Sequence, residues 1–264
     1  MDFSIVIPTF RRPQQLRDAI ASVLGQTGVT LEVFIIDDSP EGSAEAVVQE
    51  FADSRLTYLR NPKPTGGKPS IVRNLGWPRA EGAFIHFLDD DDLVPEGHYA
   101  AVKASFSRAP HVGVVFGRIE PFGEDESLVK DERAFFARAS LRAAKCQRFG
   151  SRWLFAACMF FQETLLVCSA AVVRRECVAA IRGFDPELPL MEDVDFYARA
   201  IRGFGAHFMD RVSLHYRIGP SLMRHGHKSA VDESYRRMHA RYRAERGFFE
   251  LNALRVLGRV LRVL

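Results

Sequence analysis

Residues 83–92 read AFIHFLDDDD, and this stretch decides the fold class. Its apolar first part has the length of a buried strand, and it ends abruptly in the four aspartates Asp89 to Asp92. Adjacent carboxylates repel one another unless cations neutralise some of them. Because oxygen ligands favour hard divalent ions, the segment predicts an Mg²⁺ or Mn²⁺ site directly after a strand. A solvated acidic turn before the next helix is the alternative.

Upstream of this segment, short apolar runs alternate with stretches of helical periodicity. This alternation predicts an α/β fold, with a mostly parallel sheet that is covered by helices on both faces. In such sheets ligands bind at the carboxyl ends of the strands, where the Asp37-Asp38 pair and the aspartate segment both lie. The expected strands are 4–7, 31–36, 56–59 and 83–88, and the expected helices are 13–26, 43–51 (with Ser43 as its N-cap) and 71–79.

Two stretches downstream stand apart from this pattern. Residues 118–163 have mixed charge and many Phe and Arg residues, and they predict an inserted helical segment or a mobile loop. Residues 228–264 are rich in arginine and predict a basic amphipathic helix. Such a helix can lie on an anionic membrane surface, pack on the domain or join a second subunit in a homodimer. Its apolar stripe would be Leu254, Leu257, Leu261 and Leu264.

The composition is that of an ordinary globular protein. The 264 residues are 47% hydrophobic and 26% charged with a net charge of +3, and basic residues do not alternate with aromatics, so we expect no nucleic-acid partner. Four cysteines without a CxxC pair indicate buried thiols in a reducing compartment. No apolar run reaches the roughly 20 residues of a membrane span, and no basic leader precedes the first strand, so we expect a cytoplasmic protein.

Short motifs follow one another along the chain in a specific order and spacing. Together they resemble family-2 glycosyltransferases over roughly residues 4–217. The resemblance implies a GT-A fold, which is a Rossmann-like sheet, followed here by a helical C-terminal extension. The motifs are 5–12 (IVIPTFRR), 22–27 (SVLGQT), 36–38 (IDD), 73–76 (RNLG), 80–82 (AEG), 87–92 (FLDDDD), Ser169, 174–175 (RR), 183–185 (GFD), 192–195 (EDVD), Arg199, Gly203 and 215–217 (HYR).

The resemblance also implies an activity. Family-2 enzymes move a sugar from a nucleotide-diphosphate donor to an acceptor hydroxyl, with inversion at the anomeric carbon, and a UDP-sugar and a glycan or lipid-linked acceptor of bacterial cell surfaces are favoured here. Residues 1–117 would form the nucleotide-sugar-binding half and residues 118–227 the acceptor-binding half, with the insertion at 118–163. Residues 228–264 would form the extension, which leaves open a peripheral position at the inner face of the membrane.

In this family the donor site lies at the ends of the first, second and fourth strands. Asp91 is the expected ligand of the Mg²⁺ or Mn²⁺ ion, and Asp89 is either a second ligand or a contact of the ribose or donor sugar. From the residues alone, an Asx turn at Asp37-Asp38 and a surface position for Arg73 are the alternatives. The residues that the resemblance assigns to the nucleotide are Pro8, Thr9, Phe10, Arg12, Asp37, Asp38, Arg73, Asp89 and Asp90.

The pair Glu192-Asp193 matches the acidic motif whose aspartate is the proposed base of the family. Asp193 would accept the proton of the acceptor hydroxyl, and its apolar neighbours would raise its pKa towards neutrality. An N-cap of a helix over 194–201 is the alternative. Three histidines remain unassigned candidates for assisting the metal: His215, His225 and His227.

Several positions depart from the family pattern. Arg11 stands where the family usually has Asn, and the turn Asp38-Ser39-Pro40 lacks the usual Gly. The QxxRW segment of processive members is missing, which argues against a polymer synthase. Two other functions remain as alternatives, a non-catalytic nucleotide- or sugar-binding relative and a sugar nucleotidyltransferase. The second would need a Gly-rich phosphate loop after the first strand, which residues 8–11 do not provide.

Overall fold

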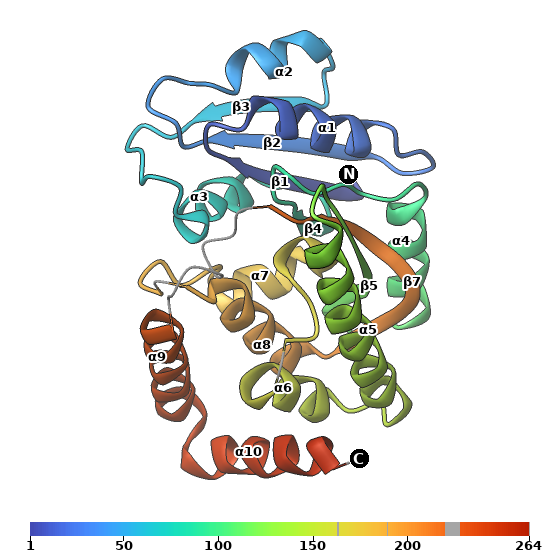
Figure 1. Cartoon of the computed structure of the whole chain (residues 1–264), viewed down its shortest axis with the longest axis vertical. Coiled ribbons are helices and arrows are strands. Elements are labelled where there is room, and N and C mark those ends of the chain that lie inside the picture. The colour runs from blue at the N-terminus through green and yellow to red at the C-terminus, as the bar shows by residue number, and fades with distance from the viewer. Residues whose placement is uncertain (163, 189, 220–227, 264) are drawn as a thin grey trace.

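The computed structural model describes residues 1–162, 164–188, 190–219 and 228–263, which form one seven-stranded sheet and the helices around it (Figure 1). The strand order is β3-β2-β1-β4-β6-β5-β7. β6 runs antiparallel to both its neighbours and the other pairings are parallel, which confirms the predicted mostly parallel sheet. The strands are β1 (Phe3–Thr9), β2 (Leu31–Asp37), β3 (Leu56–Arg60), β4 (Phe84–Phe87), β5 (Val114–Phe122), β6 (Ala171–Arg174) and β7 (Ala206–Arg217).

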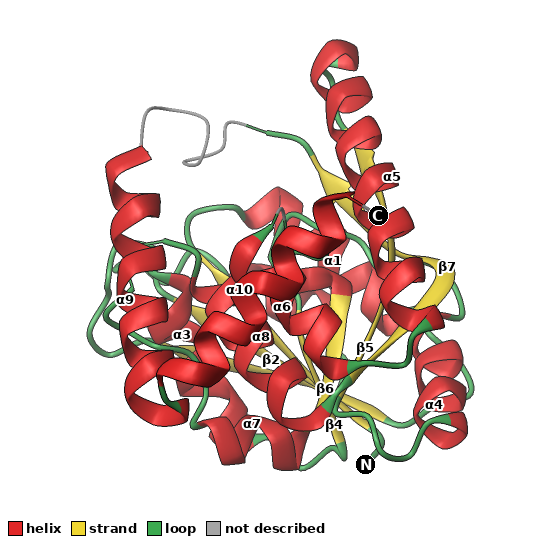
Figure 2. Ribbon diagram, turned by 90° about the horizontal axis from the view of Figure 1, so that it is seen from below, coloured by secondary structure: helices red, strands yellow, loops and turns green. Residues whose placement is uncertain are grey.

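Helices cover the sheet, as Figure 2 shows from a second direction. The early helices α1 and α3 both begin with a proline in the first turn, where its missing N–H costs no hydrogen bond. The helices are α1 (Pro13–Leu24), α2 (Glu45–Phe51), α3 (Pro69–Gly76), α4 (His98–Arg108), α5 (Glu126–Arg148), α6 (Arg152–Phe161), α7 (Arg175–Ile181), α8 (Glu192–Phe204), α9 (Lys228–Arg246) and α10 (Phe248–Val263), with short 3₁₀ turns at Trp77–Arg79 and Cys168–Ala170.

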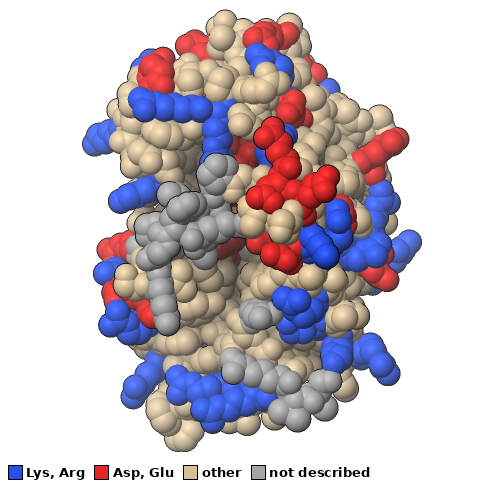
Figure 3. All heavy atoms as spheres, viewed as in Figure 1, with Lys and Arg blue, Asp and Glu red and all other residues tan. Residues whose placement is uncertain are grey.

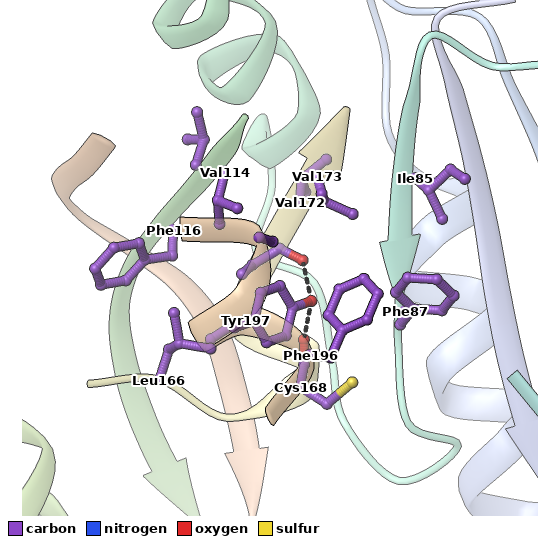
Figure 4. Close-up of a cluster of buried hydrophobic side chains, with 14 of the residues drawn as sticks. Ile85, Phe87, Val114, Phe116, Leu166, Cys168, Val172, Val173, Phe196 and Tyr197 are labelled. Atoms are coloured by element: carbon purple, nitrogen blue, oxygen red, sulfur yellow. Dashed lines mark hydrogen bonds between the residues drawn. The ribbon is translucent and has the colours of Figure 1, made fainter. Parts of the chain in front are cut away.

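The central strand β4 is buried on both faces, which explains its continuous apolar run. Phe84 stacks on Phe106 of α4 at 4.3 Å between ring centroids. Phe87 lies three positions further along and therefore points to the opposite face, where it meets Phe196 of α8 edge-on (Figure 4). The strand β4, after which the aspartate segment begins, is thus held in place by packing on both faces of the sheet.

Helix α3 lies unusually close to β1. A Cβ atom at Gly76 would come within 2.5 Å of the Val6 side chain, so only glycine permits this approach. The helix carries Arg73 one turn before Gly76. Because α3 packs closely on β1, the Arg73 guanidinium is held near the carboxyl ends of the strands.

The expectation of an irregular or mobile stretch at residues 118–163 is wrong for most of its length, and the helical alternative is confirmed. Residues 118–122 belong to β5, which crosses the expected boundary at residue 117 without a break. The two helices α5 and α6 follow, and Asp125 caps α5 by accepting a hydrogen bond from the Leu128 N–H at 3.0 Å. Because α5 packs along β5 and β7, this stretch is part of the folded body.

The C-terminal extension is helical, as expected, but it consists of two helices. Leu254 is fully buried, and Leu257 and Leu261 are packed on the core, so this stripe faces the protein. The position of Leu264 lies outside the described residues. For the described leucines of the predicted stripe, the structure therefore supports the alternative of packing on the domain. Within the described ranges, no helix has the length and apolar character needed to span a membrane.

Candidate active site

The ends of β1 and β4 meet through Asp90. Its Oδ2 accepts a hydrogen bond from the Thr9 hydroxyl at 2.7 Å, and its Oδ1 lies 3.2 Å from Nη1 of Arg12. Burial raises the pKa of Asp90 to about 6, against the effect of the Thr9 hydrogen bond. Asp90 therefore ties the loop after β1 to the aspartate segment, and its expected contact with the nucleotide stays a prediction.

Asp37 is also a structural residue. Its side chain is fully buried and accepts hydrogen bonds from the N–H groups of Ser39 and Ala44, both at 2.9 Å, and from the Tyr58 hydroxyl at 3.2 Å. The contact with Ser39 is an Asx turn, as the alternative predicted, and the expected contact of Asp37 with a nucleoside stays a prediction. Helix α2 begins at Glu45, and Ser43 is not its N-cap.

Asp38 holds the loop that follows β3. It accepts hydrogen bonds from the Asn61 side chain at 2.6 Å, the Thr65 hydroxyl at 2.8 Å and the Gly67 N–H at 2.7 Å. Although burial favours the neutral acid, these bonds keep the pKa of Asp38 below its usual value. Phe10 packs against Gly67, so the loops after β1 and β3 touch. A cavity of about 510 Å³ opens beside them, lined by Pro40, Arg60, Asn61, Pro62 and Pro64.

Two arginines contact the end of the aspartate segment. Arg12 Nη1 lies 2.6 Å from Asp91, and the N–H and Nε of Arg217 bind the side chain of Asp92 and the carbonyl of Asp91 at 3.0 and 2.8 Å. Asp92 is fully buried, its Oδ2 has no hydrogen-bond partner among the described residues, and burial raises its pKa well above the usual range. Arg12 thus supplies one cation to the segment, but repulsion among the carboxylates still raises the pKa of Asp91 and Asp92, so the predicted Mg²⁺ or Mn²⁺ ion stays a prediction.

Arg73 joins the aspartate segment to the acidic pair of α8. Its side chain is 3% exposed, with Nη2 at 2.5 Å from Asp89 and Nη1 at 2.9 Å from Glu192. Burial opposes the charge, but Asp89 and Glu192 hold the pKa of Arg73 well above its usual value. The surface alternative for Arg73 is therefore wrong. These three residues come from α3, the end of β4 and the start of α8, and they form the Asp89–Arg73–Glu192 bridge.

The residue after Arg73 fixes the loop that carries the GFD motif. Asn74 donates to the Phe184 carbonyl at 2.8 Å and accepts from the Phe184 N–H at 3.0 Å. Gly183 has a φ of +70°, a backbone conformation that favours glycine. A Cβ there would also lie 2.5 Å from the Asn74 side chain, so the contact too requires glycine. The Phe184 ring in turn packs 5.2 Å from the Arg73 guanidinium. The motif at residues 73–76 is thus in direct contact with the motif at residues 183–185.

Asp193 lies in the first turn of α8, next to Glu192. The N-cap position is Met191, with a φ of +62°, so the N-cap alternative for Asp193 is wrong. Its carboxylate accepts a hydrogen bond from the Val194 N–H at 2.8 Å. Burial and the charge of Glu192 raise the pKa of Asp193 to about 7, despite the opposing charge of Arg73. This carboxylate can accept a proton at neutral pH.

Helix α9 contributes contacts that the sequence did not indicate. Its Arg241 pairs with Asp185 of the GFD motif and with the buried Asp195 of α8. Its Ser234 hydroxyl accepts a hydrogen bond from the Leu190 N–H at 3.3 Å, just before α8. The arginine-rich composition of this region was visible, but its partners lie about 50 residues away and have no local signal.

Of the three candidate histidines, the structure describes only His215. The backbone of His215 pairs with Leu93, which holds β7 beside the aspartate segment. His225 and His227 lie outside the described residues. Among the residues that the structure describes, no three His, Cys, Asp or Glu side chains gather as a metal site. Asp89 and Asp91 are nevertheless partly exposed, at 34% and 28%, and offer hard oxygen ligands that substrate oxygens could complete.

Comparison with known proteins gives a match to one protein family and to several relatives. The family model described as Glycosyl transferase family 2 matches residues 4–178. The Escherichia coli UDP-Glc:alpha-D-GlcNAc-diphosphoundecaprenol beta-1,3-glucosyltransferase WfgD is 36% identical over 90 residues, which are 34% of this chain and 35% of that protein. The chain spans only 12% to 35% of the length of the first three curated relatives that it matches.

Two solved structures share the fold. Residues 1–349 of TarS from S. aureus superpose with a TM-score of 0.67 at 18% identity, over 92% of this chain and 66% of that one. The mannosyltransferase PcManGT from Pyrobaculum calidifontis, in complex with GDP-Man and Mn²⁺, gives a TM-score of 0.59 at 16% identity, over 99% of this chain and 80% of that one. At these identities the likeness concerns the fold alone.

Proposed function

The chain belongs to glycosyl transferase family 2, and from this premise we propose that it moves a sugar from a nucleotide-diphosphate donor, a UDP-sugar in the favoured case, to an acceptor hydroxyl with inversion of the anomeric carbon. The Asp89–Arg73–Glu192 bridge carries the proposal. It joins the donor side of the site to Asp193, the candidate base. Because the family match ends at residue 178, the role of Asp193 rests on this geometry.

The reaction is a single displacement. The Asp193 carboxylate takes the proton of the acceptor hydroxyl while that oxygen forms a bond to the anomeric carbon. The bond from that carbon to the diphosphate oxygen breaks, and its electron pair leaves with the nucleoside diphosphate. A pKa near 7 suits this task, because the carboxylate is charged at neutral pH and still basic enough to accept a proton.

The donor would lie over the ends of β1, β2 and β4. Its nucleoside would occupy the cavity beside the loop that Asp38 holds, with Phe10 at its border, and its diphosphate would face Arg12. A divalent Mg²⁺ or Mn²⁺ ion held by Asp91 and Asp89 would supply positive charge to the departing diphosphate. Arg12 is 47% exposed at its side chain, so it can leave Asp91 when the donor binds.

The acceptor is proposed as a hydroxyl of a lipid-linked sugar or a glycan in bacterial cell-surface assembly. The match to WfgD, whose acceptor is a diphosphoundecaprenol-linked sugar, supports this class. A non-catalytic relative is the weaker alternative, because Asp193 combines a raised pKa with a position beside the Asp89–Arg73–Glu192 bridge. A sugar nucleotidyltransferase would need a Gly-rich phosphate loop, and the loop after β1 reads Phe10-Arg11-Arg12.

Nucleotide binding tests the donor half of the proposal. We expect one of UDP, GDP, dTDP and CMP to raise the thermal midpoint of the protein in the presence of Mn²⁺, because a ligand that binds only the folded state stabilises it. The variant Asp91→Ala should lose the part of the shift that depends on Mn²⁺. The exposed Asp210, which is 84% exposed at its side chain, provides the control Asp210→Ala, which should keep it. No shift with any nucleotide would refute the donor site.

A further inference from the structure

The outward face of α10 is apolar although no other part of the described chain covers it. Phe249, Ala253, Val256 and Val260 follow one another at intervals of four, three and four residues, which places them on one stripe of the helix. Phe249 is 88% exposed, Val256 56% and Val260 48%. The stripe lies opposite the buried leucines, so α10 is apolar on two sides. A surface helix normally presents polar residues to water, and contiguous exposed apolar side chains mark an interaction site.

Arginines flank this stripe. Arg255 and Arg259 are exposed on α10, and Arg243 and Arg246 are exposed just before it. Glu250, the one acidic residue of α10, is turned inward, where it lies 2.5 Å from the Tyr242 hydroxyl and 2.9 Å from Arg202. The exposed charged residues of α10 that are described are therefore arginines, and the exposed Glu245 lies before the helix, between Arg243 and Arg246. In Figure 3 basic side chains line the lower end of the molecule, where Figure 1 places α10.

We propose that this outer face binds the surface of a membrane that contains anionic lipids, with α10 lying along the interface. The exposed Phe and Val side chains would enter the boundary between head groups and acyl chains, and the arginines would pair with lipid phosphates. The membrane-facing stripe is thus Phe249–Val260, which the sequence alone did not single out. The proposal goes beyond sugar transfer and does not depend on it.

A second copy of the chain is a poorer occupant of the same face. Two copies that met through α10 would bring their arginine rows together, and the face has no acidic residue to pair with them. An anionic lipid surface complements both properties of the face at once. The folded position of α10 supports this, because its leucine stripe remains packed on α6 while the outer stripe is free.

Co-sedimentation of the full chain with lipid vesicles tests the proposal. We expect binding to vesicles of phosphatidylcholine with phosphatidylglycerol, weakened by salt, and much weaker binding to phosphatidylcholine alone. Phe249→Ser with Val256→Ser should weaken binding about tenfold or more through lost apolar contact. Arg255→Gln with Arg259→Gln should weaken it by about 30-fold on anionic vesicles.

Matched controls come from α5. Leu141, which is 68% exposed, gives Leu141→Ser, and the exposed pair Lys130→Gln with Arg138→Gln removes the same charge elsewhere. These controls should bind vesicles as the wild type does, and every variant should keep its thermal midpoint and its nucleotide-induced shift. Equal binding by the α10 variants and the wild type would overturn the proposal. A dimer in light scattering that Val256→Ser abolishes, without vesicle binding, would overturn it in favour of a subunit interface.

Discussion

Asp193 is a carboxylic acid that folding partly withdraws from water and places beside Glu192, and this changes its protonation between the folded and unfolded chain. The pKa rises from an ordinary 3.8 to about 7 on folding. Between these values the folded protein holds the proton that the unfolded chain has lost. The stabilising contribution of this group is therefore present at low pH and is lost as the pH rises through about 7.

This titration predicts how Asp193→Asn affects stability. The variant has no charge to bury, so it should match the wild type near pH 4 and exceed its free energy of unfolding by about 1–3 kcal/mol at pH 8. Urea unfolding at several pH values measures the difference. Asp210→Asn, on the surface, should show no such trend with pH. A constant difference across the pH range for Asp193→Asn would mean that its carboxyl is not perturbed.

Single residues show where sequence reasoning stopped. The motifs identified Thr9, Arg73 and Asp193, and the structure brings all three to one end of the sheet. They could not separate Asp37 from Asp38, or Asp90 from Asp91, because neighbours in sequence point in different directions. What each carboxylate holds is decided by partners that are distant in sequence, such as Tyr58 for Asp37 and Thr9 for Asp90.

At the scale of elements, α9 is held to α8 by buried charge. Arg241 pairs with Asp195, which is 1% exposed, and with Asp185. We predict that Arg241→Met lowers the free energy of unfolding by about 1–3 kcal/mol, since Asp195 keeps Arg199 but loses its second partner. Chemical denaturation measures this change. Arg236→Met, at a side chain 74% exposed, should cost less than about 0.5 kcal/mol.

An Arg241→Met variant as stable as the wild type would show that the ion pairs do not fasten α9. Loss of stability in Arg236→Met of the same size would show that the effect is a general property of the helix.

The elements that the sequence predicted well have strong periodicity. The strands β1, β2 and β4 are apolar runs because both their faces are buried, while the edge strand β3 is only partly buried. The predicted bounds of all four agree with the structure within two residues. The helix α5 was harder to predict because its 23 residues bury only a narrow face against β5 and β7, so its composition resembles that of a charged loop. For α10 the buried stripe was visible, but which of its two apolar sides faces the protein depends on the position of α6.

At the scale of the whole molecule, the strand order explains how one site forms from distant segments. β1 and β4 are neighbours although about 75 residues separate them, and α3 and α8 lie on the same face of the sheet, where Gly76 meets Val6 and Phe87 meets Phe196. The donor loops, the Asp89–Arg73–Glu192 bridge and Asp193 are thereby assembled by the sheet. The outer face of α10 forms a different part of the surface, so the proposed sugar transfer and the proposed membrane binding can be tested independently.

The most direct test of the proposed chemistry is release of nucleoside diphosphate from the nucleotide sugar whose base gives the thermal shift. We predict that Asp193→Asn retains that shift, while its release rate at pH 8 falls by about 10²–10⁴-fold, because the base that activates the hydroxyl or water is gone. The wild-type rate should fall as the pH drops below about 7, where Asp193 takes up its proton. An Asp193→Asn variant that releases nucleotide at the wild-type rate would contradict the account.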